Sequence, residues 1–220
     1  EIEASYADAF AAASDADDPR AELLSKMSKH WASTDGRASE AILEMMESLI
    51  ELRQSGRALT IRPMAQMVGW PEMDSPEKLA AWLAEQPPTK IQQMGEDGLA
   101  EIIRTESEGF DRTIVLVGNV HARKAELTGL PGVQLMAMLV PDSISLIVLH
   151  DGGTSWSKTN GEARITDVFK TNAMNNVADS MAVGPEKQPP YPGDVPNFDG
   201  YVSVGAITAS SPAMPSAETP

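Results

Sequence analysis

The sequence lacks cysteine and is poor in histidine, aromatic residues and positive charge. Its 220 residues include no Cys and 3 His, aromatic residues make up 5%, and 17 Lys and Arg face 32 Asp and Glu, for a net charge of -15. The absence of cysteine excludes disulfides and thiolate chemistry. The negative charge makes nucleic acid a poor partner for the bulk surface, so we interpret the acidity as a solubility feature.

Long apolar runs are missing as well. No stretch approaches the roughly 20 consecutive apolar residues that a helix needs to span a bilayer, so we expect no transmembrane segment. Hydrophobic residues still make up 42% of the chain, and this length is enough for one good-sized domain with a substantial core. We predict a single domain over residues 1–208 and a disordered Pro/Ala/Ser tail over residues 209–220.

Several common catalytic motifs are absent from the sequence. It contains no pair of histidines four apart on a helix, no phosphate-binding Gly-rich loop and no Gly-x-Ser-x-Gly element. What remains for chemistry is a site centred on histidine and carboxylates. The candidates are His30, His121 and His150, and we interpret His30, beside Trp31 near a helix end, as structural.

The fold prediction depends most on residues 113–117, which read Thr-Ile-Val-Leu-Val. A short apolar run rich in β-branched residues is typical of a central strand buried on both faces, as in a parallel sheet. Gly118 ends this run, and Asn119 and His121 follow directly. Because ligands in open α/β sheets bind just beyond the carboxyl ends of the strands, these residues are predicted to line a site.

A second apolar run covers residues 143–150 and predicts another strand. It ends in His150 and Asp151, followed by Gly152 and Gly153. Polar, titratable side chains therefore follow both of the clearest strands. We add His150 and Asp151 to the candidate ligand-binding residues around His121.

The remaining pattern predicts helices alternating with short strands. Asp18 before Pro19, and Ser75 before Pro76, are typical helix starts. The sequence predicts helices over residues 4–14, 19–31, 40–55 and 76–86, strands over 59–61 and 201–207, a polar loop over 154–164, and one or two helices over 165–181. Residues 89–103 have helical spacing too, although Gly95 and Gly98 leave open whether that helix is continuous. The predicted fold class is α/β, a mostly parallel sheet flanked by helices with an irregular C-terminal tail.

Short motifs spread along the chain resemble one protein superfamily. They are Val-Leu-Val-Gly-Asn-Val-His-Ala at residues 115–122, the Asp-Gly-Arg-x-Ser turn at 35–39, the Gly-Gly pair at 152–153 before Trp156, and residues 205–213. These motifs resemble the haem-binding-uptake, Tiki-like superfamily, which includes ChaN-type proteins and is related to TraB, Tiki and erythromycin-esterase proteins. Only the Gly-Asn-x-His-Ala element has much specificity.

The superfamily also has an earlier Gly-Glu-x-His motif on a first strand and a second strand that ends in a carboxylate. The first of these is not present in the sequence, and Glu1 before Ile2 matches the end of the second. The resemblance therefore implies that N-terminal strands lie upstream of Glu1. It also implies an exported protein, periplasmic or secreted.

The resemblance assigns roles to individual residues. His121 would be a metal ligand or general base, Glu1 its catalytic carboxylate partner, and Asn119 would orient a neighbour by hydrogen bonding. Arg37 would pair with an anionic group of the ligand or with Glu1. Gly118, at the end of the predicted strand, is counted with Asn119 among the ligand-binding residues.

Three functions remain open at this point. The first is a ligand-binding protein for haem or a divalent metal, in the manner of ChaN-type proteins. The second is a metal-dependent or His/Glu-dependent hydrolase of esterase or peptidase type. The third is a scaffold without surviving activity. In the first two, the partner is a small-molecule or metal-bearing ligand at the His121 site.

Overall fold

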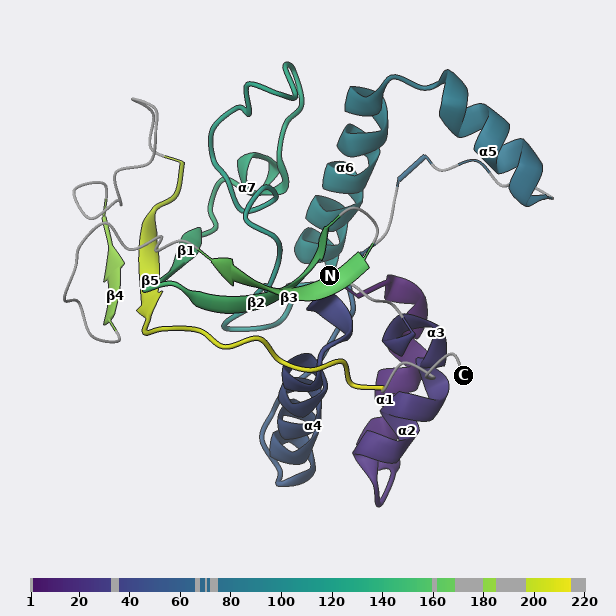
Figure 1. Cartoon of the computed structure of the whole chain (residues 1–220), viewed down its shortest axis with the longest axis vertical. Coiled ribbons are helices and arrows are strands. Elements are labelled where there is room, and N and C mark those ends of the chain that lie inside the picture. The colour runs from purple at the N-terminus through teal and green to yellow at the C-terminus, as the bar shows by residue number, and fades with distance from the viewer. Residues whose placement is uncertain are drawn as a thin grey trace. The chain divides into compact units, whose positions relative to one another are not determined.

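The computed structural model describes residues 2–32, 36–65, 68–69, 71, 75–159, 162–168, 180–184 and 197–214. Its elements combine helices with short strands, as the α/β prediction expected (Figure 1). Where we expected a single domain over residues 1–208, the chain contacts group into two compact units. One unit is built mainly from residues 64–148 and 179–203, and the other from residues 2–63, 149–178 and 204–220. We describe each by itself.

The unit that contains the N-terminal residues is mainly helical. Its helices are η1 (Ala4–Tyr6), α1 (Ala7–Asp15), α2 (Pro19–Lys26), α3 (Ser28–Trp31), η2 (Gly36–Ala38) and α4 (Glu40–Gln54). The predicted caps form, since Asp18 accepts a hydrogen bond from Ala21 N at 2.9 Å. The predicted helix over 19–31 is interrupted at Met27, which is fully buried.

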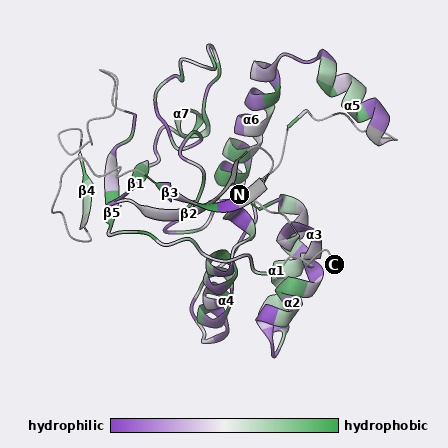
Figure 2. Ribbon diagram, viewed as in Figure 1, coloured by the Kyte–Doolittle hydropathy of each residue, from purple (hydrophilic) through white to green (hydrophobic). Residues whose placement is uncertain are grey.

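The core of this unit lies between α1, α2 and α4. Its largest fully buried side chains include Leu23, Trp31, Leu43 and Ile50. Trp31 satisfies its buried indole N–H by donating to Leu23 O at 2.9 Å. Hydrophobic and hydrophilic residues alternate along α4 in Figure 2, the amphipathic pattern that buries one face of a helix.

The same unit carries a β-hairpin that the sequence analysis missed. Strands β2 (Gly153–Thr159) and β3 (Glu162–Val168) pair antiparallel, from Gly153 opposite Val168 to Thr159 opposite Glu162. The predicted polar loop over 154–164 and the helix starting at 165 are therefore wrong in the described residues. The remainder of that predicted helical region, residues 169–179, lies outside the described residues.

The other unit is organised around one long helix. It contains α5 (Pro76–Glu85), α6 (Pro88–Glu106) and α7 (Met136–Leu139). Helix α6 is continuous through Gly95 and Gly98, where the sequence left the helix uncertain. Its buried Leu99 and Ala100 pack with Met136 and Ala137 at the start of α7, and this burial outweighs the low helix propensity of glycine.

The described strands form small sheets that are not mostly parallel. Strands β1 (Leu146–His150), β5 (Gly200–Val204) and β4 (Ser180–Val183) form one sheet in the order β1-β5-β4, with β4 antiparallel to β5. Strand β1 confirms the second predicted strand, and β5 confirms most of the last one. The brief strand predicted over residues 59–61 is absent from that described segment.

The central strand predicted over residues 113–117 does not form. The segment has no regular secondary structure, and Ile114 and Leu116 are 96% and 60% exposed. A strand needs a neighbour for its backbone hydrogen bonds, and β propensity is realised only where such a neighbour buries the side chains. Within the described chain no strand pairs with this segment, and only Val117 is partly buried against the core cluster around Leu99.

Residues 209–214, the first part of the predicted disordered tail, make specific backbone contacts. Ala213 N donates to Ala38 O at 2.9 Å, and Glu40 N donates to Ser211 O at 2.7 Å. The bond from Glu40 satisfies a backbone donor at the start of α4. Residues 215–220 lie outside the described residues.

Among the helices that the structure describes, none has both the length and the apolar character to cross a membrane.

Candidate functional site

His121 lies in a turn that follows segment 113–118. The turn is closed by Ala122 N donating to Gly118 O at 3.3 Å and Arg123 N donating to Val120 O at 3.2 Å. The backbone of His121 is fixed as well, because Ala137 N at the start of α7 donates to His121 O at 3.0 Å. The imidazole is therefore carried by a turn tied to α7, rather than by the end of a buried strand.

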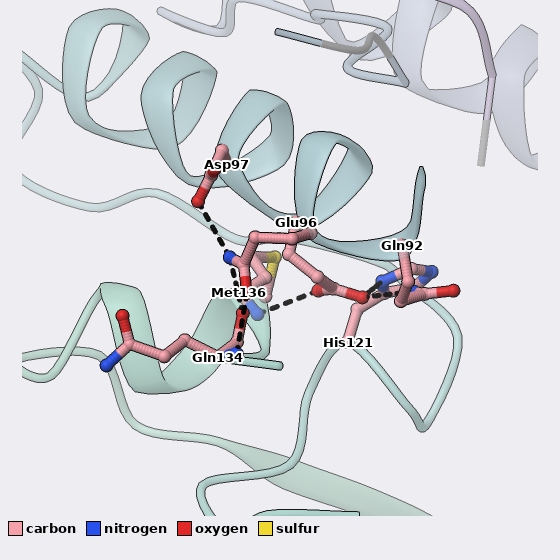
Figure 3. Close-up of polar contacts among 7 residues, drawn as sticks. Gln92, Glu96, Asp97, His121, Gln134 and Met136 are labelled. Atoms are coloured by element: carbon pink, nitrogen blue, oxygen red, sulfur yellow. Dashed lines mark hydrogen bonds and ion pairs between the residues drawn. The ribbon is translucent and has the colours of Figure 1, made fainter. Parts of the chain in front are cut away.

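The partner of His121 is a glutamate that the sequence analysis did not select. Nδ1 of His121 lies 2.8 Å from Oε1 of Glu96, which projects from the middle of α6 (Figure 3). The Glu96 side chain has no exposed surface, and that of His121 is 17% exposed. The pair thus places a buried carboxylate behind an imidazole that reaches the surface.

Glu96 is held by two further donors. Oε2 accepts from Met136 N at 2.8 Å, and Oε1 also accepts from Nε2 of Gln92, one helical turn earlier. A buried charge is costly unless it is paired and hydrogen-bonded, and these three donors meet that requirement. Together they fix the Glu96 carboxylate in a single orientation toward His121.

A second glutamine on α6, Gln93, hydrogen-bonds to the backbone just before α7. Gln93 accepts from Gln134 N at 2.8 Å through Oε1 and donates to Gln134 O at 3.1 Å through Nε2. It also donates to Asp97 Oδ1 at 2.8 Å. Gln93 and Glu96 therefore bind the backbone at Gln134 and Met136 from one helix, which anchors the start of α7 beside His121.

This arrangement determines how the imidazole can act. A carboxylate at Nδ1 favours the tautomer with the proton on Nδ1, so the proton-accepting lone pair lies on Nε2. An imidazole held in this way serves either as a general base or as a metal ligand, and the carboxylate raises its basicity in both roles. Among the described residues no three His, Asp or Glu side chains are grouped to hold an ion.

The other predicted residues near His121 are placed differently. Gly118 and Asn119 lie in the same turn and are exposed, and Gly118 O accepts the turn's hydrogen bond from Ala122. Asn119 is therefore positioned at the surface beside His121. Glu1, predicted as the catalytic carboxylate, lies outside the described residues. In the described chain the carboxylate on His121 is that of Glu96.

His150, Asp151 and Arg37 belong to the other unit. His150 ends β1, half-buried, and its Nδ1 accepts from Gly152 N at 3.2 Å. Asp151 N donates to Gly205 O at 3.3 Å, and Arg37 is an exposed residue of η2. His150 and Asp151 thus help to join residues 150–154 to residues 205–207.

Three of the short motifs that carry the resemblance lie together in this unit. Gly153 has φ +117°, and a Cβ there would lie 1.9 Å from Ile207 O, so only glycine fits. Thr154 N donates to Ile207 O at 2.9 Å, which brings residues 152–153 and 205–213 side by side. The η2 turn joins them through the bond from Ala213 to Ala38.

A polar cluster follows His121 in the turn. Nζ of Lys124 lies 2.6 Å from Oδ2 of Asp199, which also accepts from Ser145 N at 2.7 Å. Burial alone would raise the pKa of the Asp199 carboxyl, but the hydrogen bond and charge of Lys124 and the bond from Ser145 hold this pKa below its ordinary value. Arg123 donates from Nη2 to Asn197 Oδ1 at 2.9 Å.

Glu96 could have been found from the sequence by its position on the helix. Gln92, Glu96, Leu99 and Ile103 are spaced so that they share one face, and Leu99 belongs to the apolar stripe. A carboxylate on the buried face of a helix requires partners, and a nearby histidine is a natural one. The two glycines beside it obscured the helix, and with it this signal.

Compared with known proteins, the chain matches no family model, no curated protein and no solved structure. The resemblance to the haem-binding-uptake, Tiki-like superfamily therefore stays a prediction.

Proposed function

We propose that this protein binds a metal-bearing ligand of the haem type through Nε2 of His121, with Glu96 as the carboxylate that orients the imidazole. The observation that carries the proposal is the 2.8 Å contact between His121 Nδ1 and a Glu96 carboxylate that has no exposed surface. Metal-ligating histidines characteristically donate their other ring N–H to a carboxylate or carbonyl. The motif around His121 supports the same assignment by resemblance to ChaN-type proteins.

Haem suits a single oriented imidazole better than a bare ion does. A bare ion such as Zn²⁺ binds several protein side chains, usually three or four. Haem iron is held by the porphyrin nitrogens and needs only one or two ligands from the protein. His121 would supply one of these, and Glu96 would strengthen it as a donor. When bound, the haem supplies the iron chemistry, and the residues of this chain bind and orient it.

Titration with haem, followed by absorbance in the Soret region, tests the proposal. The wild-type protein should shift the Soret band at micromolar concentration, and His121→Ala should lose the spectral signature of histidine ligation. Asp97→Asn is a matched control, because Asp97 lies beside Glu96 on α6 and accepts from Gln93. A Soret band that is unchanged by wild-type protein, or one equally shifted by His121→Ala, contradicts the proposal.

The His121–Glu96 pair also favours a second candidate, a His/Glu-dependent hydrolase. An imidazole whose Nδ1–H is held by a carboxylate is a general base at Nε2, suited to activating water or a hydroxyl nucleophile. A panel of ester and peptide substrates tests this. Turnover that disappears in His121→Ala and persists in Asp97→Asn supports a hydrolase, and turnover that survives His121→Ala excludes His121 as its base.

A further inference from the structure

Residues 113–117 have no hydrogen-bonded neighbour strand. In the part of the chain that the structure describes, no hydrogen bond joins their backbone N–H and C=O groups to another residue. Their exposure alternates with the two-residue period of a strand, because Ile114 and Leu116 are 96% and 60% exposed and Val115 between them is half-buried. The segment therefore follows the pattern of a strand with one side on its own unit and the other side open.

The segment also lacks the features that keep edge strands from pairing. Natural sheets protect their edges with lysine, proline or β-bulges. Residues 113–122 contain no Asp, Glu, Lys, Arg or Pro. One side of the segment is already supported, since Val117 packs against the core cluster around Leu99. An unprotected apolar segment on such a support is a template for strand addition by another chain.

We infer that the added strand is the same segment of a second copy of this chain. Antiparallel pairing about a two-fold axis at Val115 places Ile114 of each copy opposite Leu116 of the other, and Thr113 opposite Val117. Every cross-strand pair is then uncharged, and most of them join two apolar side chains, which stabilises a sheet. A two-fold interface requires one patch to be complementary to itself, and this run meets that requirement. The inference does not depend on the proposed function.

The charges beside the segment favour the antiparallel arrangement. Residues 106–112, which precede it, hold three acidic residues and one arginine, whereas residues 118–124, which follow it, hold Arg123 and Lys124 and no acidic residue. Lys124 is paired with Asp199, so Arg123 supplies the positive charge of this end. Antiparallel pairing brings the acidic end of each copy beside the positive end of the other, whereas parallel pairing would oppose the two acidic ends.

The association is expected to be weak. A pairing of five residues from each copy is smaller than the roughly 1,200 Å² of a standard interface. Each copy also carries a net charge of -15, although at physiological salt the Debye length is about 8 Å and screens this repulsion. Sedimentation equilibrium of the wild-type protein between about 10 µM and 1 mM should show reversible dimerisation. Protein that stays monomeric over this range overturns the inference.

Ile114→Lys tests the segment, and Ile144→Lys is the matched control. Both isoleucines are exposed, at 96% and 68%, and they belong to the same unit. Ile114→Lys should weaken dimerisation about tenfold or more, because the two-fold axis places the new charge in the apolar pairing twice. Ile144→Lys should change it by less than about twofold. Equal effects of the two variants, or a loss in Ile144→Lys only, overturn the inference, since another apolar surface would then join the copies. In the separate chain Ile114 is in water, so denaturation at low protein concentration still reports on the monomer.

Introduced cysteines test the register of the pairing, and the chain has none of its own. The Cα atoms of Ile114 in one copy and Leu116 in the other should lie about 5 Å apart, within range of a disulfide, whereas those of the two Thr113 residues should lie more than about 13 Å apart. Under mild oxidation a mixture of Ile114→Cys and Leu116→Cys should therefore form the mixed disulfide, identified by mass, and Thr113→Cys alone should remain monomeric. Absence of the mixed disulfide, or equal cross-linking of Thr113→Cys, overturns the inference.

Discussion

Nδ1 of His121 and Oε1 of Glu96 lie 2.8 Å apart, although the two residues are 25 positions apart in the chain. The contact joins a half-buried imidazole on a turn to a fully buried carboxylate on α6. The same carboxylate binds Met136 N at the start of α7. One glutamate therefore links the candidate site to the packing of its unit, and changes to it should affect both.

Replacement of Glu96 by glutamine should destabilise the protein. The carboxylate accepts at both oxygens, so whichever way the new amide is turned, its NH₂ group faces a donor. We expect the free energy of unfolding to fall by about 1–3 kcal/mol, the usual cost of a buried polar group left unsatisfied. Asp97→Asn keeps its acceptor oxygen for Gln93 and should change that free energy by less than about 0.5 kcal/mol.

Urea denaturation of the two variants beside the wild type measures the difference. Equal stabilities of Glu96→Gln and Asp97→Asn would mean that the hydrogen bonds of Glu96 do not contribute to the free energy of unfolding. That result would contradict the proposal that Glu96 holds the His121 imidazole in one orientation.

Gln93 should protect one backbone amide in particular. Its side chain accepts from Gln134 N, while that of Glu96 accepts from Met136 N two residues on. Gln93→Ala should speed hydrogen exchange at the Gln134 amide and leave the Met136 amide protected. Glu96→Ala should do the reverse, because each of these truncations removes the acceptor of one amide only.

Residue-resolved hydrogen exchange by NMR reports both amides in one experiment. If both amides lose protection together in each variant, the two side chains act on one cooperative unit rather than on separate bonds.

The helices were predictable from the sequence because a helix satisfies its own backbone. The apolar stripe of α4 and the caps of α2 and α5 at Asp18 and Ser75 are local signals, and each is found in the structure. The strands depended on partners that the sequence does not specify. Residues 113–117 and 146–149 read almost alike, yet only the second run is paired, in β1. Hydrophobic pattern alone cannot tell these two outcomes apart.

The hairpin of β2 and β3 has a local signal in the sequence. Asn160 and Gly161 lie in the sequence between β2 and β3, and Asn-Gly is the strongest short hairpin signal. For the site, His121 was predicted from the residues around it, while its partner Glu96 comes from a distant helix. A contact of that kind depends on tertiary packing, which the spacing of residues in one segment does not reveal.

Two isoleucines of similar sequence context should respond very differently to truncation. Ile114 is 96% exposed and Ile147 in β1 is 6% exposed. Ile147→Ala should lower the free energy of unfolding by about 2–5 kcal/mol, because it removes buried methyl groups and leaves a cavity. Ile114→Ala should change it by less than about 0.5 kcal/mol, since its side chain is already in water.

Chemical denaturation of both variants is the measurement. A large loss in Ile114→Ala would show that residues 113–117 are buried in solution, and it would restore the central strand that the sequence alone predicted.

Acid should weaken the contact that holds β5 beside residue 145. The pKa of Asp199 lies below its ordinary value, and such a group contributes stability at pH above its unfolded-state pKa and loses it as pH falls through the folded value. The stability difference between wild type and Asp199→Asn should thus be constant above about pH 5 and shrink below about pH 4. Its size should be modest, because both side chains are partly exposed to solvent.

Lys124→Met removes the main partner that lowers the pKa of Asp199, so it should flatten the same acid dependence. Thermal unfolding of the three proteins between pH 3 and pH 7 measures this, and a difference that grows toward low pH would mean that Asp199 is protonated more readily in the folded protein.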